Sequence, residues 1–113
     1  MSQTYSPDEV EAWLDANLPT WRLEQGFLVR TYTTPGWPVT LLLANAIGYL
    51  AEAAWHHPEL TLHYSRLRVR LQTHEAGGIT DKDLELARRI EAVVTWKPAP
   101  DDALTGISAP WVE

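Results

Sequence analysis

A chain of 113 residues suffices for one domain with a modest core, and its formal net charge of −6 with nine basic residues argues against nucleic acid as a partner. No apolar run approaches the roughly 20 residues that cross a bilayer, and no cysteine is present to form a disulfide or a thiolate zinc site. The sequence begins without the basic and apolar stretches of a signal peptide, so we expect a cytoplasmic protein.

The first predicted elements are a helix and a hairpin. Residues 6–9, Ser-Pro-Asp-Glu, combine an N-cap serine, a first-turn proline and the acid of a capping box. Apolar residues at helical spacing then predict that this helix runs to about Asn17. Residues 21–25 and 27–33 predict two short strands, which join as a hairpin at Gln25-Gly26.

The second predicted helix, residues 39–56, is apolar on most of its sides. Such a helix is expected to be buried on two faces, by the sheet of its own subunit and by a second subunit. We therefore expect a homodimer or a larger oligomer. The helix should end at His57-Pro58, because the residue before a proline is driven out of helical backbone.

Two more strands and a helix follow. Residues 60–64 and 67–73 predict strands, and the second alternates apolar with polar side chains, as a half-buried antiparallel strand does. A third helix, capped by a threonine, occupies residues 80–94. The order α-β-β-α-β-β-α predicts a two-layer α+β domain over residues 1–95, with a four-stranded antiparallel sheet and the helices on one of its faces.

Residues 96–113 form a C-terminal tail of different character, with several prolines, two tryptophans and no periodicity. Proline content and the lack of periodicity favour a surface tail with little regular structure. The two tryptophans favour the alternative, in which the tail docks onto its own subunit or a neighbour.

Three of the four histidines, His56, His57 and His74, fall within nineteen residues. Glu52 lies four residues before His56, which predicts that both share one face at the end of the second helix. Imidazole exchanges protons near neutral pH, so one histidine can act as an acid and another as a base while a carboxylate fixes a tautomer. This spacing favours an acid–base site over a metal centre, since no H-x3-H pair lies on one helix face.

The full pattern, E-x3-H-H-P-x5-Y-x9-H-x8-D, is similar to the signature of the pterin-4a-carbinolamine dehydratases. By this resemblance, the three clustered histidines correspond to the catalytic histidines of that family and Glu52 to the carboxylate that supports them. Asp83 completes the motif, and it could equally serve as the N3 acid of the third helix. The resemblance, which covers residues 8–95, implies a flat bicyclic pterin as the substrate, no metal or other cofactor, and a dimer or tetramer.

Trp55 departs from the family pattern, where a small or polar residue typically precedes the histidine pair. A tryptophan here could simply pack, could fill the space meant for the pterin, or could stack on the pterin. Trp55, residues 73–80 and the tail residues 104–111 together resemble one branch of the family. That branch consists of dehydratase-like proteins of α-carboxysome RuBisCO operons, which act as RuBisCO assembly factors.

Two hypotheses of different class follow. The branch resemblance favours an assembly factor or chaperone that binds RuBisCO subunits in a bacterial cytoplasm, in association with the carboxysome. Six tryptophans in one small chain fit such a protein-binding surface. The alternative is an active dehydratase, a lyase that converts 4a-hydroxytetrahydrobiopterin to quinonoid dihydropterin by histidine acid–base catalysis. Neither hypothesis involves a nucleic acid or a membrane.

Overall fold

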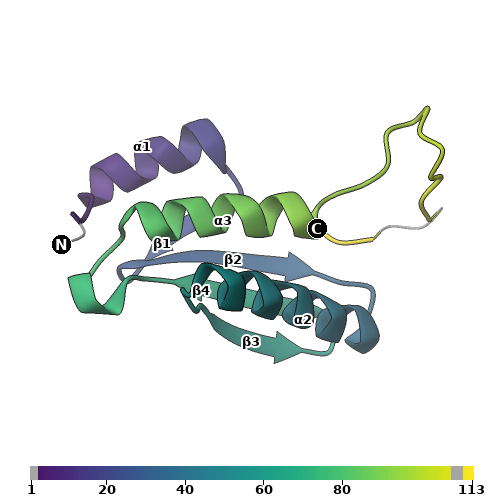
Figure 1. The fold of residues 1–113 in the computed structure, drawn as a ribbon, viewed down its shortest axis with the longest axis horizontal. Coiled ribbons are helices and arrows are strands. Elements are labelled where there is room, and N and C mark those ends of the chain that lie inside the picture. Colours follow the sequence, from purple (N-terminus) through teal and green to yellow (C-terminus); the bar gives the residue numbers. More distant parts are fainter. Residues whose placement is uncertain (1–2, 108–110) are drawn as a thin grey trace.

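The computed structural model describes residues 3–107 and 111–113, in which helices pack on one face of an antiparallel sheet (Figure 1). In chain order the elements are α1 (Pro7–Asn17), β1 (Arg22–Glu24), β2 (Phe27–Thr33), α2 (Trp37–Ala54), β3 (Glu59–His63), β4 (Arg66–Leu71), the 3₁₀ turn η1 (His74–Ala76) and α3 (Asp81–Val94). The sheet order is β1-β2-β4-β3, with every neighbouring pair antiparallel. The predicted fold class and element order are confirmed.

The core lies between this sheet and the helices. Leu28 of β2 pairs with Leu71 of β4, and Tyr32 pairs with Leu67, so one face of the sheet presents a continuous buried row. Residues one position away along each strand, such as Val29, point to the opposite face, because side chains alternate along a strand. Burial of this row against α2 and α3 holds the two layers together.

Local sequence signals account for the helix start and the turn that were predicted near the N-terminus. Ser6 and Glu9 form the predicted capping box at the start of α1. Gln25 and Gly26 both have positive φ, 51° and 81°, as the two central residues of a type I′ hairpin turn do. The first third of the fold therefore follows from local chemistry.

The helix α2 differs from its prediction at both ends, since it begins at Trp37 and ends at Ala54 rather than running from 39 to 56. Its Ile47 and Ala51 are buried against the sheet, whereas Leu42 and Tyr49 on other sides are exposed. The second apolar face predicted for α2 is therefore present, and in the single chain it is exposed to solvent. The homodimer or homotetramer remains a prediction. No helix within the described residues is long and apolar enough to cross a membrane.

The C-terminal tail leaves the end of α3, makes an excursion away from the body and returns beside the helix end (Figure 1). The backbone N–H of Glu113 donates to the carbonyl of Thr33 at the end of β2, at 2.9 Å. Val112 is buried, and Trp111 packs against the core. This supports the prediction of a tail docked on its own subunit, although Trp96 stays exposed. Pro110, which belongs to the tail pattern, lies outside the described residues.

Candidate functional site

The end of α2 determines where the clustered histidines point. Trp55 caps the helix in the left-handed conformation, with φ 52° and ψ 48°, so the chain turns sharply there. His56 and His57 consequently lie beyond the helix rather than in its last turn. The prediction that Glu52 and His56 share a helix face is therefore wrong, and each of the two histidines has a different carboxylate partner.

His56 is paired with Asp83, the third residue of α3. The Nε2 atom of His56 lies 2.6 Å from Oδ1 of Asp83, and the two side chains are 11% and 0% exposed. A carboxylate can only accept, so this contact holds a proton on Nε2 and leaves Nδ1 as the second ring nitrogen. The pair fixes both the tautomer and the orientation of the imidazole.

The second oxygen of Asp83 is also fully used. Its Oδ2 accepts a hydrogen bond from Thr73 Oγ1 at 2.7 Å and another from the backbone N–H of Thr80 at 2.9 Å. The latter bond belongs to the capping box at the start of α3. Asp83 therefore has two roles in the structure: its carboxylate caps α3, and it is the hydrogen-bond partner of His56.

His57 is paired with Glu52 on the solvent side of the same helix end. Its Nε2 atom lies 2.9 Å from Oε1 of Glu52, with side chains that are 51% and 71% exposed. Two imidazole–carboxylate pairs thus stand side by side in sequence, one enclosed and one open. The enclosed pair is rigid, whereas the open pair is accessible to a ligand.

His74 begins the exposed turn η1 and directly follows Thr73, whose hydroxyl binds Asp83. The neighbouring Glu75 has a pKa below its ordinary value, because of a backbone hydrogen bond first and because the positive charge of Lys82 lies nearby. The hydrogen bond from Thr73 to Asp83 places the start of η1 next to the buried carboxylate of the His56–Asp83 pair.

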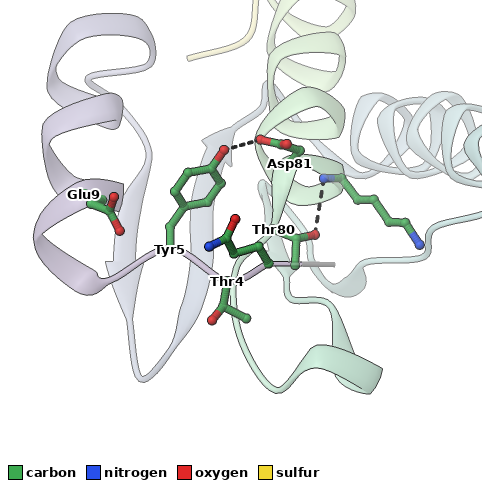
Figure 2. A pocket seen from close by; sticks show the side chains of 7 residues that line it. Thr4, Tyr5, Glu9, Thr80 and Asp81 are labelled. Carbon is green, nitrogen blue, oxygen red and sulfur yellow. Dashed lines mark hydrogen bonds between the residues drawn. The ribbon is translucent and has the colours of Figure 1, made fainter. Parts of the chain in front are cut away.

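The N-terminal segment braces the loop between η1 and α3, a feature that the sequence did not reveal (Figure 2). The backbone N–H of Tyr5 donates to the carbonyl of Ile79, and its hydroxyl donates to Asp81. A methyl group of Thr4 would lie 3.1 Å from a Cβ at Gly78, so only glycine fits there without displacement. The segment forms one wall of a polar hollow of about 370 Å³ beside the loop.

Trp55 is exposed beside His57. The indole is 76% exposed, and its centroid lies 5.1 Å from the imidazole of His57 with the two planes at 84°. The ring is therefore neither packed in the core nor plugging an enclosed cavity. An apolar hollow of about 650 Å³ lies instead between α2, the end of α3 and the tail.

Within the residues that the structure describes, no group of three or more histidine, cysteine, aspartate or glutamate side chains could hold a metal ion. The arrangement is suited to moving protons. Asp83 and Glu52 each orient one imidazole, and the exposed ring of His57 is accessible to a ligand as an acid or a base.

Comparison with known proteins identifies the family. Residues 3–93 match the family model of pterin 4 alpha carbinolamine dehydratase, and this chain belongs to that family. A relative from Aquifex aeolicus, named "Putative pterin-4-alpha-carbinolamine dehydratase", is 40% identical over 83% of this chain and 94% of its own. A relative of the same name from Natronomonas pharaonis is 42% identical over 80% of this chain and 96% of its own.

Two solved structures share the fold. The transcriptional coactivator/pterin dehydratase from Brucella melitensis superimposes with a TM-score of 0.74 at 25% identity, over 80% of this chain and 98% of that one. A pterin dehydratase-like protein, described as a RuBisCO assembly factor in the α-carboxysome, superimposes with a TM-score of 0.59 at 16% identity, over 69% of this chain and 93% of that one. The second likeness concerns the fold alone.

Proposed function

We propose that this protein is an active pterin-4a-carbinolamine dehydratase. The observation that carries the proposal is the pair of imidazole–carboxylate contacts at the end of α2, His56–Asp83 and His57–Glu52. A protein that kept only the fold would not need both contacts, since an exposed pair such as His57–Glu52 contributes little to stability. Family membership and relatives of about 40% identity favour the same function.

The reaction removes water from the 4a-hydroxytetrahydropterin ring. A base takes the proton from the ring nitrogen beside the hydroxyl-bearing carbon, the carbon–oxygen bond breaks, and an acid gives a proton to the departing hydroxyl. The electron pair of the N–H bond forms the new C=N bond, so that one water leaves. Two exposed imidazoles, those of His57 and His74, suit these two proton transfers.

The roles follow from accessibility. His57 and His74 are exposed and can reach a bound ring, so they are assigned the two proton transfers. The enclosed His56 is held by Asp83 and is assigned a supporting role beside His57. Glu52 keeps His57 in one tautomer, in the way that carboxylates orient catalytic histidines in other acid–base sites.

The test is the rate of carbinolamine dehydration above its spontaneous loss, measured by stopped-flow absorbance. His57→Ala and His74→Ala should each lower the catalysed rate by about 100- to 10,000-fold, the range for general acid–base residues. His63→Ala is the matched control, because His63 is an exposed histidine on β3 away from the helix end. A wild-type rate no faster than the uncatalysed reaction would rule the dehydratase function out.

RuBisCO assembly remains a second candidate, favoured by a specific surface. Many large apolar side chains are exposed on α2 and on the tail; they are Trp37, Leu41, Leu42, Tyr49, Trp96, Leu104 and Ile107. Such a surface could transiently cover apolar regions of incompletely assembled subunits.

Co-expression tests the assembly function separately from the chemistry. If this protein assists RuBisCO, the yield of assembled enzyme should rise with the wild-type protein and fall back with Leu42→Glu, which replaces an exposed side chain of α2. The same yield should survive His57→Ala. An unchanged yield in the presence of the wild-type protein would remove this candidate.

A further inference from the structure

Trp55 occupies a backbone conformation that disfavours it. Its φ of 52° and ψ of 48° are left-handed, where a Cβ crowds the neighbouring carbonyl and glycine or asparagine is preferred. The position ends a helix, which is the usual place for a glycine. A bulky residue that persists in such a conformation, next to candidate catalytic groups, is typical of a functional constraint.

The strained backbone of Trp55 is not offset by burial of its side chain. Trp55 is 76% exposed, and its indole makes no hydrogen bond within the described residues. Trp21 shows the contrasting structural case, since it is 2% exposed and its Nε1 donates to Glu91 at 2.9 Å. Trp55 has neither the burial nor the hydrogen bond that stabilises Trp21. The stability of the fold therefore does not explain a tryptophan at this position.

The ring contact of Trp55 directs it toward the chemistry. Its centroid lies 5.1 Å from that of His57 at an interplanar angle of 84°, an edge-to-face arrangement that orders the indole. Because the two planes are nearly perpendicular, His57 covers at most one face of the indole. The remaining face is a flat apolar surface beside an exposed imidazole.

We propose that Trp55 is a specificity-determining residue whose open face stacks on the flat bicyclic ring of the pterin and holds that ring against His57. The inference rests on the proposed dehydratase function. Stacking on an aromatic side chain selects planar heterocycles over puckered or aliphatic compounds, because only a planar ring contacts the whole indole face. The exposure of Trp55 is what such a platform requires before the ligand arrives.

If Trp55 instead obstructs the pterin, removing its indole should change the affinity for pterin in the opposite direction. If the indole blocks the ring, its removal should tighten pterin binding. If it stacks, its removal should weaken binding. Replacement by glycine tests the sign cleanly because glycine is the residue that this backbone conformation favours, so the variant should fold at least as well as the wild type.

The experiment compares Trp55→Gly, Trp55→Phe and Trp55→Leu. Affinity for 7,8-dihydropterin is measured by calorimetry, the Michaelis constant and turnover number by stopped-flow, and the melting temperature by circular dichroism. Gln25→Gly is the matched control, because Gln25 also has positive φ, 51°, and lies in the hairpin turn away from the histidines. Phenylalanine keeps a flat ring, whereas leucine keeps apolar bulk without one.

Trp55→Gly should weaken pterin binding and raise the Michaelis constant by about tenfold or more, the range for loss of one stacking contact, with turnover changed less than about threefold. Trp55→Leu should behave like glycine, and Trp55→Phe should recover much of the affinity. Both glycine variants should melt no lower than the wild type, with Gln25→Gly unchanged in affinity.

The other outcomes separate the inference from the proposed function. Unchanged or tighter binding by Trp55→Gly, with active wild type, overturns the stacking role and leaves the dehydratase standing. Pterin binding that weakens on Trp55→Gly in a protein without turnover supports the stacking role and overturns the dehydratase. A wild-type protein that binds no pterin overturns both.

Discussion

His56 and Asp83 are 27 residues apart in sequence, yet their side chains meet at 2.6 Å and join the end of α2 to the start of α3. The same carboxylate caps α3 and accepts a hydrogen bond from Thr73, the residue before His74. One buried carboxylate thus organises three elements around the candidate site. Loss of Asp83 should be felt in both the stability and the chemistry.

Asp83→Ala should lower the free energy of unfolding by about 2–4 kcal/mol. The substitution leaves the buried Thr73 hydroxyl and the backbone N–H of Thr80 without their acceptor, and it removes a helix cap. Urea unfolding followed by circular dichroism measures the change. A loss below about 0.5 kcal/mol, the range of ordinary surface substitutions, would contradict the organising role.

Glu52→Ala, unlike Asp83→Ala, should lower activity without lowering stability. The pair with His57 is exposed on both sides, so its loss should change the free energy of unfolding by less than about 0.5 kcal/mol. The dehydration rate should nevertheless fall, because His57 would lose the carboxylate that sets its tautomer. Equal urea midpoints with a reduced rate are the expected result, and a rate equal to that of the wild type would show that His57 needs no orienting group.

Gly78→Ala should be destabilising through Thr4. The new Cβ would lie 3.1 Å from the Thr4 methyl carbon, so we expect a loss of about 1 kcal/mol. Thr4→Ser removes that methyl group, and the double variant should regain most of the loss in a double-mutant cycle. Gly77→Ala is the control, since Gly77 has open space around it and a φ of 69°. Its loss should come from backbone strain and should not be rescued by Thr4→Ser.

Tyr32 should make the protein sensitive to alkaline pH. Burial first, and the hydrogen bond to Glu91 second, raise the pKa of Tyr32 well above its ordinary value of 10.0. Because the folded pKa is raised, the contribution to stability is full below about pH 10, where both states are protonated, and declines as the unfolded state ionises at higher pH.

The measurement is urea unfolding at several pH values above 9. The free energy of unfolding of the wild type should fall more steeply than that of Tyr32→Phe, by up to about 1.4 kcal/mol per pH unit. Parallel pH profiles for the two proteins would show that this phenol ionises without unfolding.

Local chemistry made most of the fold predictable from the sequence. The capping box at Ser6 and the turn at Gln25-Gly26 depend only on residues within four positions of each other, so the pattern and the structure agree there. Side-chain alternation in β4 likewise depends on the strand period alone. The histidine motif, which lies within the residues that the family model matches, could also be recognised from the sequence, since the spacing of residues is visible without a structure.

The partners of the histidines, in contrast, depended on tertiary structure. Regular helical spacing predicts that Glu52 meets His56, but a left-handed residue at 55 reverses the chain, and His57 takes that carboxylate instead. The indole at 55 offered no local sign of this conformation, because tryptophan is not a residue that favours it.

Long-range packing decided the rest. Asp83 reaches His56 only because α3 packs against α2, and the docking of Val112 depends on where β2 ends. The sequence therefore determined the elements and the residues of the candidate site, because periodicity, caps and motif spacing are local properties of the chain. Tertiary structure determined which carboxylate serves which imidazole, because that pairing depends on where two distant helices come into contact.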